Sequence, residues 1–70
     1  MTTKVFQIEG MSCNHCVMHI NKSINALNPE KVNVEIGKVI VTYDNSGLKE
    51  SEIVNAIETE GYKVINISTI

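Results

Sequence analysis

The sequence predicts an α+β domain in which one antiparallel sheet of four strands carries two helices on the same face. Two observations lead to this prediction. In the middle of the chain, apolar residues alternate with polar ones in two adjoining segments, which is the pattern of a β-hairpin. On either side of it, apolar residues recur every three or four positions, which is the pattern of an amphipathic helix, and strand-like segments lie at both ends.

The first predicted element is a strand at residues 4–8. Phe6 and Ile8 stand two positions apart and therefore lie on one face of it. Gly10 then opens a loop that continues to the start of the first helix.

The first helix is predicted at residues 15–27. One apolar stripe runs along it, formed by Val17, Ile20, Ile24 and Leu27. Asn28 and Pro29 end the helix, because Asn tolerates the left-handed terminal position and Pro cannot continue the hydrogen-bond ladder.

The hairpin follows, and we predict a two-residue turn formed by Gly37 and Lys38. This turn predicts the cross-strand pairs Ile36 with Val39, Val34 with Val41, and Val32 with Tyr43. All six side chains then fall on one face of the sheet, so the predicted register and the apolar pattern agree.

After a polar loop, residues 49–60 are predicted to form the second helix. Its inward residues are Ile53, Ala56 and Ile57, with Val54 at the margin. Lys49 stands where a capping Ser or Thr is usual. Gly61 ends the helix in the left-handed conformation, and residues 62–67 form the last strand.

The resulting order βαββαβ predicts the ferredoxin-like arrangement. Its hydrophobic core is predicted to draw on both helices and on the strands. The expected core residues are Phe6, Ile8, Val17, Ile20, Ile24, Val34, Val41, Ile53 and Ile57.

Length, charge and the distribution of apolar residues argue against several classes of function. With 70 residues, the chain is expected to form a single domain spanning 1–70. The net charge is −2, there is no Arg and the Lys residues are scattered, so nucleic acid is not an expected partner. No apolar run is long enough for membrane insertion, and no secretory signal precedes the first strand. These features predict a cytoplasmic protein. In the reducing cytoplasm, a close pair of Cys residues is more often metal-binding or redox-active than structural.

The chemistry is concentrated in residues 10–16, Gly-Met-Ser-Cys-Asn-His-Cys. Cys13 and Cys16 stand three positions apart at a helix start, where neighbouring side chains can converge on one ion. The positive end of the helix dipole lowers the pKa of a thiol placed there and favours the metal-binding thiolate. Met11 has two interpretations, a soft thioether ligand or an inward-facing hydrophobe that anchors the loop, and we favour the anchor.

Other roles for two Cys residues fit less well. A structural zinc site needs four ligands, and His15 and His19 are the only nitrogen ligands beside the single Cys pair. We interpret both His residues as surface residues near the site. A thioredoxin-like oxidoreductase is disfavoured by the short chain and by Pro29, which ends a helix. A dithiol with few other donors suits soft ions that accept low coordination, of which Cu(I) is the physiological candidate.

At this point the sequence resembles the heavy-metal-associated domain family, which includes copper chaperones and the cytosolic extensions of metal-pumping P-type ATPases. The likeness covers essentially the whole chain and is greatest to free-standing bacterial copper chaperones. It is carried by residues 10–16, Val17, Ile20, the Val32/Val34 and Val39/Val41 hairpin, Ala56-Ile57 and Gly61-Tyr62. The chain departs from the family in the connection at residues 28–31, which lacks the usual Gly-Val.

The resemblance implies that Cys13 and Cys16 are the metal ligands and that Tyr62 lies close to the metal loop. Tyr62 then has two interpretations, an aromatic residue at the edge of the core or a shield of the thiolates. Met11 and His15 are the other residues expected beside the ligands.

The expected function is that of a copper chaperone, which is not an enzyme. It would bind Cu(I) through the two thiolates and pass it by thiolate exchange to a partner such as a copper-transporting P-type ATPase. The apo protein is expected to be monomeric, and the Cu(I) form to populate a metal-bridged homodimer. A metal-binding domain cut from a P-type ATPase and a mercury-binding protein remain as alternatives.

Overall fold

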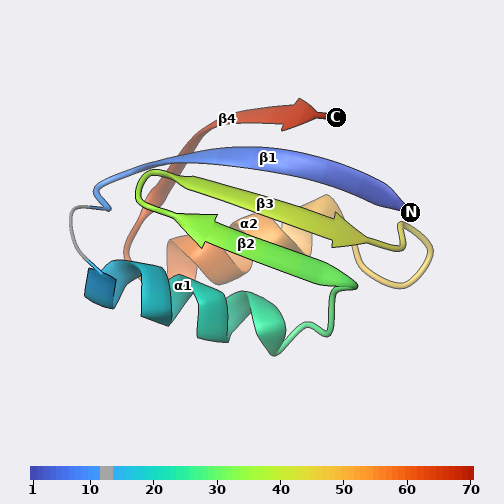
Figure 1. The fold of residues 1–70 in the computed structure, drawn as a ribbon, viewed down its shortest axis with the longest axis horizontal. Helices are drawn as coiled ribbons and strands as arrows, with labels where there is room; N and C mark the ends of the chain where they lie inside the picture. The colour runs from blue at the N-terminus through green and yellow to red at the C-terminus, as the bar shows by residue number, and fades with distance from the viewer. Residues whose placement is uncertain (12–13) are drawn as a thin grey trace.

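The computed structural model describes residues 1–11 and 14–70, and Figure 1 shows their arrangement. The elements are β1 (Thr2–Glu9), α1 (Asn14–Asn25), β2 (Lys31–Glu35), β3 (Lys38–Tyr43), α2 (Glu50–Thr59) and β4 (Lys63–Thr69). Each predicted element is confirmed in the predicted order. The strand β1 begins earlier than predicted, at Thr2, because its first residues pair with β3, and β4 runs on to Thr69, which pairs with Lys4 of β1.

The four strands form one antiparallel sheet in the order β2-β3-β1-β4. Along β3 the buried residues Val39, Val41 and Tyr43 alternate with half-exposed ones, so one face of the sheet is covered. The inward residues of both helices belong to the same core cluster as these strand residues. Both helices therefore pack on one face, which confirms the ferredoxin-like arrangement (Figure 1).

The core follows the prediction with a few additions. Of the nine expected residues, Val17 and Val34 are only partly buried and pack against the core, and the others are buried. The additional buried side chains are Met11, Val39, Tyr43 and Leu48. Leu48 was assigned to a polar loop, yet it closes the core next to the start of α2.

The predicted hairpin register is wrong by two residues. Val34 pairs with Val39 and Val32 with Val41, so the turn consists of Ile36 and Gly37 instead of Gly37 and Lys38. Gly37 has a φ of 81°, and as the second turn residue it supplies the left-handed conformation at no steric cost. A shift of two residues leaves every strand side chain on its predicted face, and only Ile36 moves outward, to 56% exposure.

The left-handed conformation predicted after each helix is confirmed, although α1 ends at Asn25 and α2 at Thr59, earlier than predicted. Asn28 has a φ of 58° and Gly61 a φ of 97°, the left-handed conformation expected of each. The start of α2 has no side-chain cap at Lys49. Among the residues that the structure describes, no helix has both the length and the apolar character needed to cross a membrane.

Candidate metal centre

Three connections meet at one end of the molecule. Figure 1 shows the end of β1 and the start of α1 there, together with the β2–β3 turn and the α2–β4 connection, away from the chain ends. The backbone N–H of Ile8 donates to the carbonyl oxygen of Gly37 at 2.9 Å, which ties the end of β1 to the hairpin turn. The predicted metal loop thus starts from a fixed strand end.

Gly10 and Met11 are the first two residues of the predicted metal loop, and the structure describes both. Gly10 adopts a φ of 96°, and a β-carbon placed on it would stand 3.7 Å from Cδ1 of Tyr62. The side chain of Met11 is 7% exposed and belongs to the core cluster. The inward orientation that we favoured for Met11 is therefore confirmed.

Cys16 lies in the first turn of α1. Its side chain is partly buried and packs against the core cluster. The first turn of an α-helix carries backbone N–H groups without partners inside the helix, so Cys16 lies at the positive end of the α1 dipole. The other predicted ligand, Cys13, lies outside the described residues.

Tyr62 lies in the connection between α2 and β4, directly after the left-handed Gly61. Its side chain is half-buried and packs against the core, and its ring lies beside Gly10, 3.7 Å from where a β-carbon on that residue would stand. Gly10 and Tyr62, which are 52 residues apart in sequence, therefore lie close together. Whether Tyr62 shields the thiolates stays a prediction.

The two His residues lie on the exposed surface of α1, as predicted. Nδ1 of His19 lies 4.0 Å from Oε1 of Glu60, the C-cap residue that follows α2. The sequence did not predict that Glu60 lies near His19, because this proximity depends on how α1 and α2 pack against each other. Within residues 1–11 and 14–70, no three His, Cys, Asp or Glu side chains gather into a metal-binding cluster.

The comparison with protein families decides the classification. The family described as the heavy-metal-associated domain matches residues 5–63. The chain belongs to the heavy-metal-associated domain family.

Individual copper proteins are similar to this chain along nearly their whole length. The copper chaperone CopZ of Bacillus subtilis is 42% identical over 67 residues, which cover 91% of this chain and 97% of that protein. The solution structure of a putative copper-ion-binding protein from Bacillus anthracis is 43% identical with a TM-score of 0.82, covering 93% of this chain and 94% of the other.

A more distant structural relative is the yeast copper transporter domain Ccc2a, whose structure is described in the apo and Cu(I)-loaded states. It is 25% identical with a TM-score of 0.81, and the match covers all of this chain and 96% of that domain. The βαββαβ fold is thus shared between free chaperones and a domain of a copper transporter.

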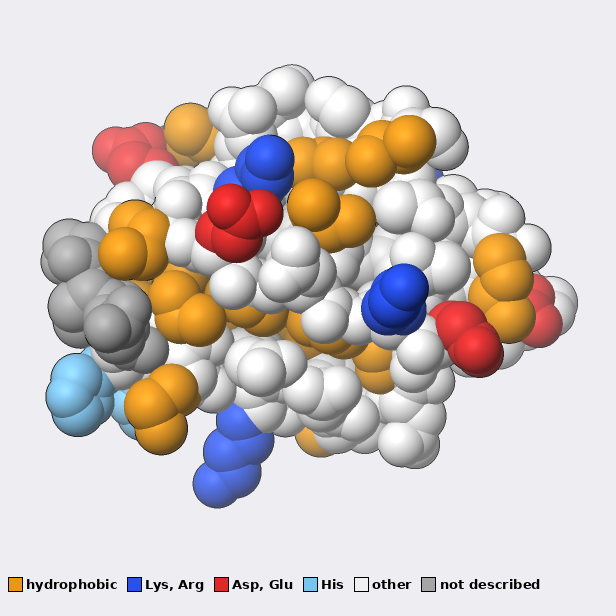
Figure 2. Space-filling model, in the orientation of Figure 1, with side chains coloured by type: hydrophobic (Ala, Val, Ile, Leu, Met, Phe, Trp, Pro, Cys, Tyr) orange, Lys and Arg blue, Asp and Glu red, His pale blue; other side chains and the backbone are white. Residues whose placement is uncertain are grey.

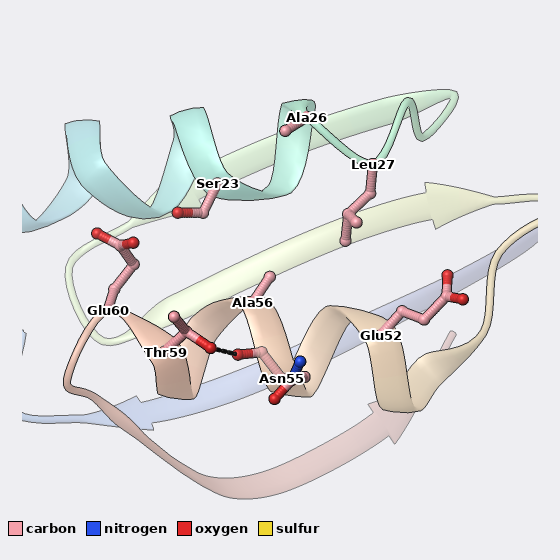
Figure 3. Close-up of a pocket in the computed structure, with 8 residues that line it drawn as sticks. All are labelled: Ser23, Ala26, Leu27, Glu52, Asn55, Ala56, Thr59 and Glu60. Atoms are coloured by element: carbon pink, nitrogen blue, oxygen red, sulfur yellow. Dashed lines mark hydrogen bonds between the residues drawn. The ribbon is translucent and has the colours of Figure 1, made fainter.

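This heavy-metal-associated domain also has an open groove of about 520 Å³ between α1 and α2, which the sequence did not predict (Figure 3). Its lining residues are Ser23, Ala26, Leu27, Glu52, Asn55, Ala56, Thr59 and Glu60. The groove contains no Cys or His and has no part in the candidate metal centre.

Proposed function

We propose that this protein is a copper chaperone that binds one Cu(I) between Cys13 and Cys16 and delivers it to an acceptor protein. The observation that carries the proposal is the 42% identity with a copper chaperone across 97% of that protein's length. We further propose that the chain is a single non-catalytic domain, spanning 1–70, that acts in the cytoplasm, where thiols stay reduced.

The local structure supports a dithiolate site for a soft ion. Cys16 lies at the start of α1, and Cys13 precedes it by three residues in sequence. Thiolates are the ligands that Cu(I) prefers, and two of them are enough for an ion that accepts low coordination. Met11 is buried and belongs to the core cluster, which supports a ligand set made up of the two Cys residues alone.

Transfer then proceeds by ligand exchange without a change of oxidation state. A thiolate of the acceptor forms a third copper–sulfur bond, and one of the bonds to Cys13 or Cys16 breaks. The released thiolate takes up a proton as the incoming thiol loses one, so charge and protons balance. Each step replaces one copper–sulfur bond by another, which keeps the barrier low while the ion stays tightly held.

We propose a copper-transporting P-type ATPase as the acceptor. The fold shared with the yeast copper transporter domain supports this partner, because two domains of one shape can present matching metal loops to each other. The same open coordination position admits a second copy of this chain. The apo protein is therefore proposed to be a monomer, and the Cu(I) form to populate a metal-bridged homodimer.

Two side chains are proposed to act beside the ligands. Tyr62 packs at the loop end of β1 and is half-buried, which suits a role in shielding the thiolates from water. His15 directly precedes Cys16 and is exposed, which suits a role at the rim of the site during exchange.

The yeast domain also supports a second candidate function, that of a metal-binding domain attached to a copper transporter. The coding sequence around the gene separates the two candidates, because only the second requires membrane-spanning segments in the same chain. A protein that binds mercury in place of copper would be expected to lose Cu(I) to the chelator in the experiment below.

The deciding experiment is anaerobic titration of the reduced protein with Cu(I) against a competing chelator, with native mass spectrometry of the products. We expect one Cu(I) per chain, and loss of tight binding in Cys13→Ser and in Cys16→Ser. Met18→Leu is the matched control, because Met18 is an exposed sulfur on α1 that the proposal does not use. Near-native affinity in either Cys variant, or failure of the reduced native protein to hold Cu(I) against the chelator, would overturn the assignment.

A further inference from the structure

His15 and His19 form an exposed pair on the surface of α1. Both lie within the helix, four residues apart, and both are solvent-exposed. They are the only His residues of the chain, and Figure 2 shows pale blue His side chains on the surface at one end of the molecule. The copper chemistry proposed above assigns no ligand role to either ring.

The spacing of the pair suits the coordination of a single ion. Residues four apart on an α-helix have β-carbons roughly 5–6 Å apart, so two imidazoles on one face can reach a common point above the helix. The same His-x3-His spacing supplies two of the zinc ligands in helical metalloprotease sites. Because both rings face solvent, water can complete the coordination shell.

Glu60 provides a second, independent observation. Its Oε1 lies 4.0 Å from Nδ1 of His19, across the interface between α1 and α2. Metal-bound imidazoles commonly donate their other ring N–H to a carboxylate, which fixes the ring and leaves the opposite nitrogen for the ion. A small side-chain rotation would bring Glu60 into hydrogen bonding with Nδ1, and Nε2 of His19 would then face solvent as a ligand.

We propose that His15 and His19 form a second metal site, which takes a divalent ion of borderline softness and is separate from the Cys13/Cys16 site. Glu60 acts as a positioning residue for His19. Two imidazoles suit Cu(II), Ni(II) or Zn(II) and not the hard ions Mg²⁺ and Ca²⁺, and the order of affinities places Cu(II) first. An ion held there links two successive turns of α1 and stabilises the folded protein, because it binds the helix and not the unfolded chain.

The test removes the thiolates so that only the His pair remains. The Cys13→Ser/Cys16→Ser chain is titrated with Cu(II) and, separately, with Zn(II), and binding is followed by calorimetry. If this variant does not fold, the native chain alkylated at both thiols with iodoacetamide replaces it. Electron paramagnetic resonance of the Cu(II) sample counts the bound nitrogens, since each imidazole nitrogen splits the signal.

We expect one ion per chain and the signature of two imidazoles. His15→Asn and His19→Asn should each leave one imidazole and weaken binding more than Glu60→Gln does, and Glu60→Gln should weaken it by up to roughly tenfold. Met18→Leu lies between the two His residues on α1 and should change nothing. Affinity that is unaffected by either His variant, or a spectrum without two imidazole nitrogens, overturns the proposal and places the ion elsewhere, such as at the terminal amine.

Discussion

Substitutions at Met11 can distinguish a role as an anchor of the metal loop from a role as a metal ligand, because its side chain contains sulfur and is part of the core. If it is an anchor, its loss should unfold the protein more easily; if it is a ligand, its loss should weaken copper binding. Met11→Ala tests the first role. Met11→Leu keeps the volume and removes the sulfur, and so tests the second.

The expected cost of Met11→Ala follows from its burial. The side chain is 7% exposed, so truncation forfeits nearly all of the about 1.5–3 kcal/mol that burial of such a side chain contributes. The space left behind adds to this, but Met11 lies in a loop at the rim of the core, where neighbours can close part of it. We therefore expect a loss of about 2–3 kcal/mol, the lower part of the roughly 2–5 kcal/mol range for buried Met→Ala changes.

This loss is large for so small a protein. At roughly 0.05–0.15 kcal/mol per residue, 70 residues correspond to a total of about 4–10 kcal/mol. The melting temperature should fall by about 10–20 °C, since each kcal/mol shifts it by roughly 4–8 °C in domains of this size. Urea unfolding of the apo protein, followed by circular dichroism, measures the free energy directly.

The Met11→Leu variant tests whether the thioether is a copper ligand. Met11→Leu should lose less than about 1.5 kcal/mol of stability, and its Cu(I) affinity in chelator competition should match that of the native protein. A Leu variant that is as stable as the native protein but binds Cu(I) clearly more weakly would show that the thioether is a ligand. An Ala variant with unchanged unfolding free energy would refute the anchoring role.

Three further predictions follow from the core, the metal loop and the loop before α2. The apo protein should keep its fold after chelation, because the core consists of hydrophobic side chains; a random-coil far-UV spectrum would contradict this. Sedimentation under anaerobic conditions should show monomers without Cu(I) and dimers with it, whereas identical profiles would indicate a shielded site. Asp44 accepts hydrogen bonds from the backbone N–H of Ser46 at 3.0 Å and from its hydroxyl at 2.7 Å, which lower the Asp44 pKa from 3.8. Its stabilising effect is therefore present above pH 3.8 and lost as the pH falls through the lowered value, so Asp44→Asn should reduce acid sensitivity in urea unfolding at a series of pH values.

The sequence by itself determined the features that depend on neighbouring residues. The left-handed helix ends at Asn28 and Gly61 follow from the conformations that these two residue types tolerate. The buried face of β3 follows from side-chain alternation, which survives a shift of two residues in register. The pair Cys13 and Cys16 was recognisable for the same reason, because its spacing is a feature of neighbouring residues in the sequence.

Only the tertiary structure decided the features that depend on how distant elements meet. Gly37 can occupy either position of a two-residue turn, and the sequence predicted the first. In the structure it occupies the second position, where its carbonyl oxygen accepts a hydrogen bond from Ile8 of β1. Tyr62 lies beside Gly10 and Glu60 approaches His19, although the residues of each pair are about 40 to 50 positions apart in sequence. Such contacts are set by the packing of helices on the sheet, where many side chains together fix the angle and separation of the elements, and no local pattern in the sequence encodes that geometry.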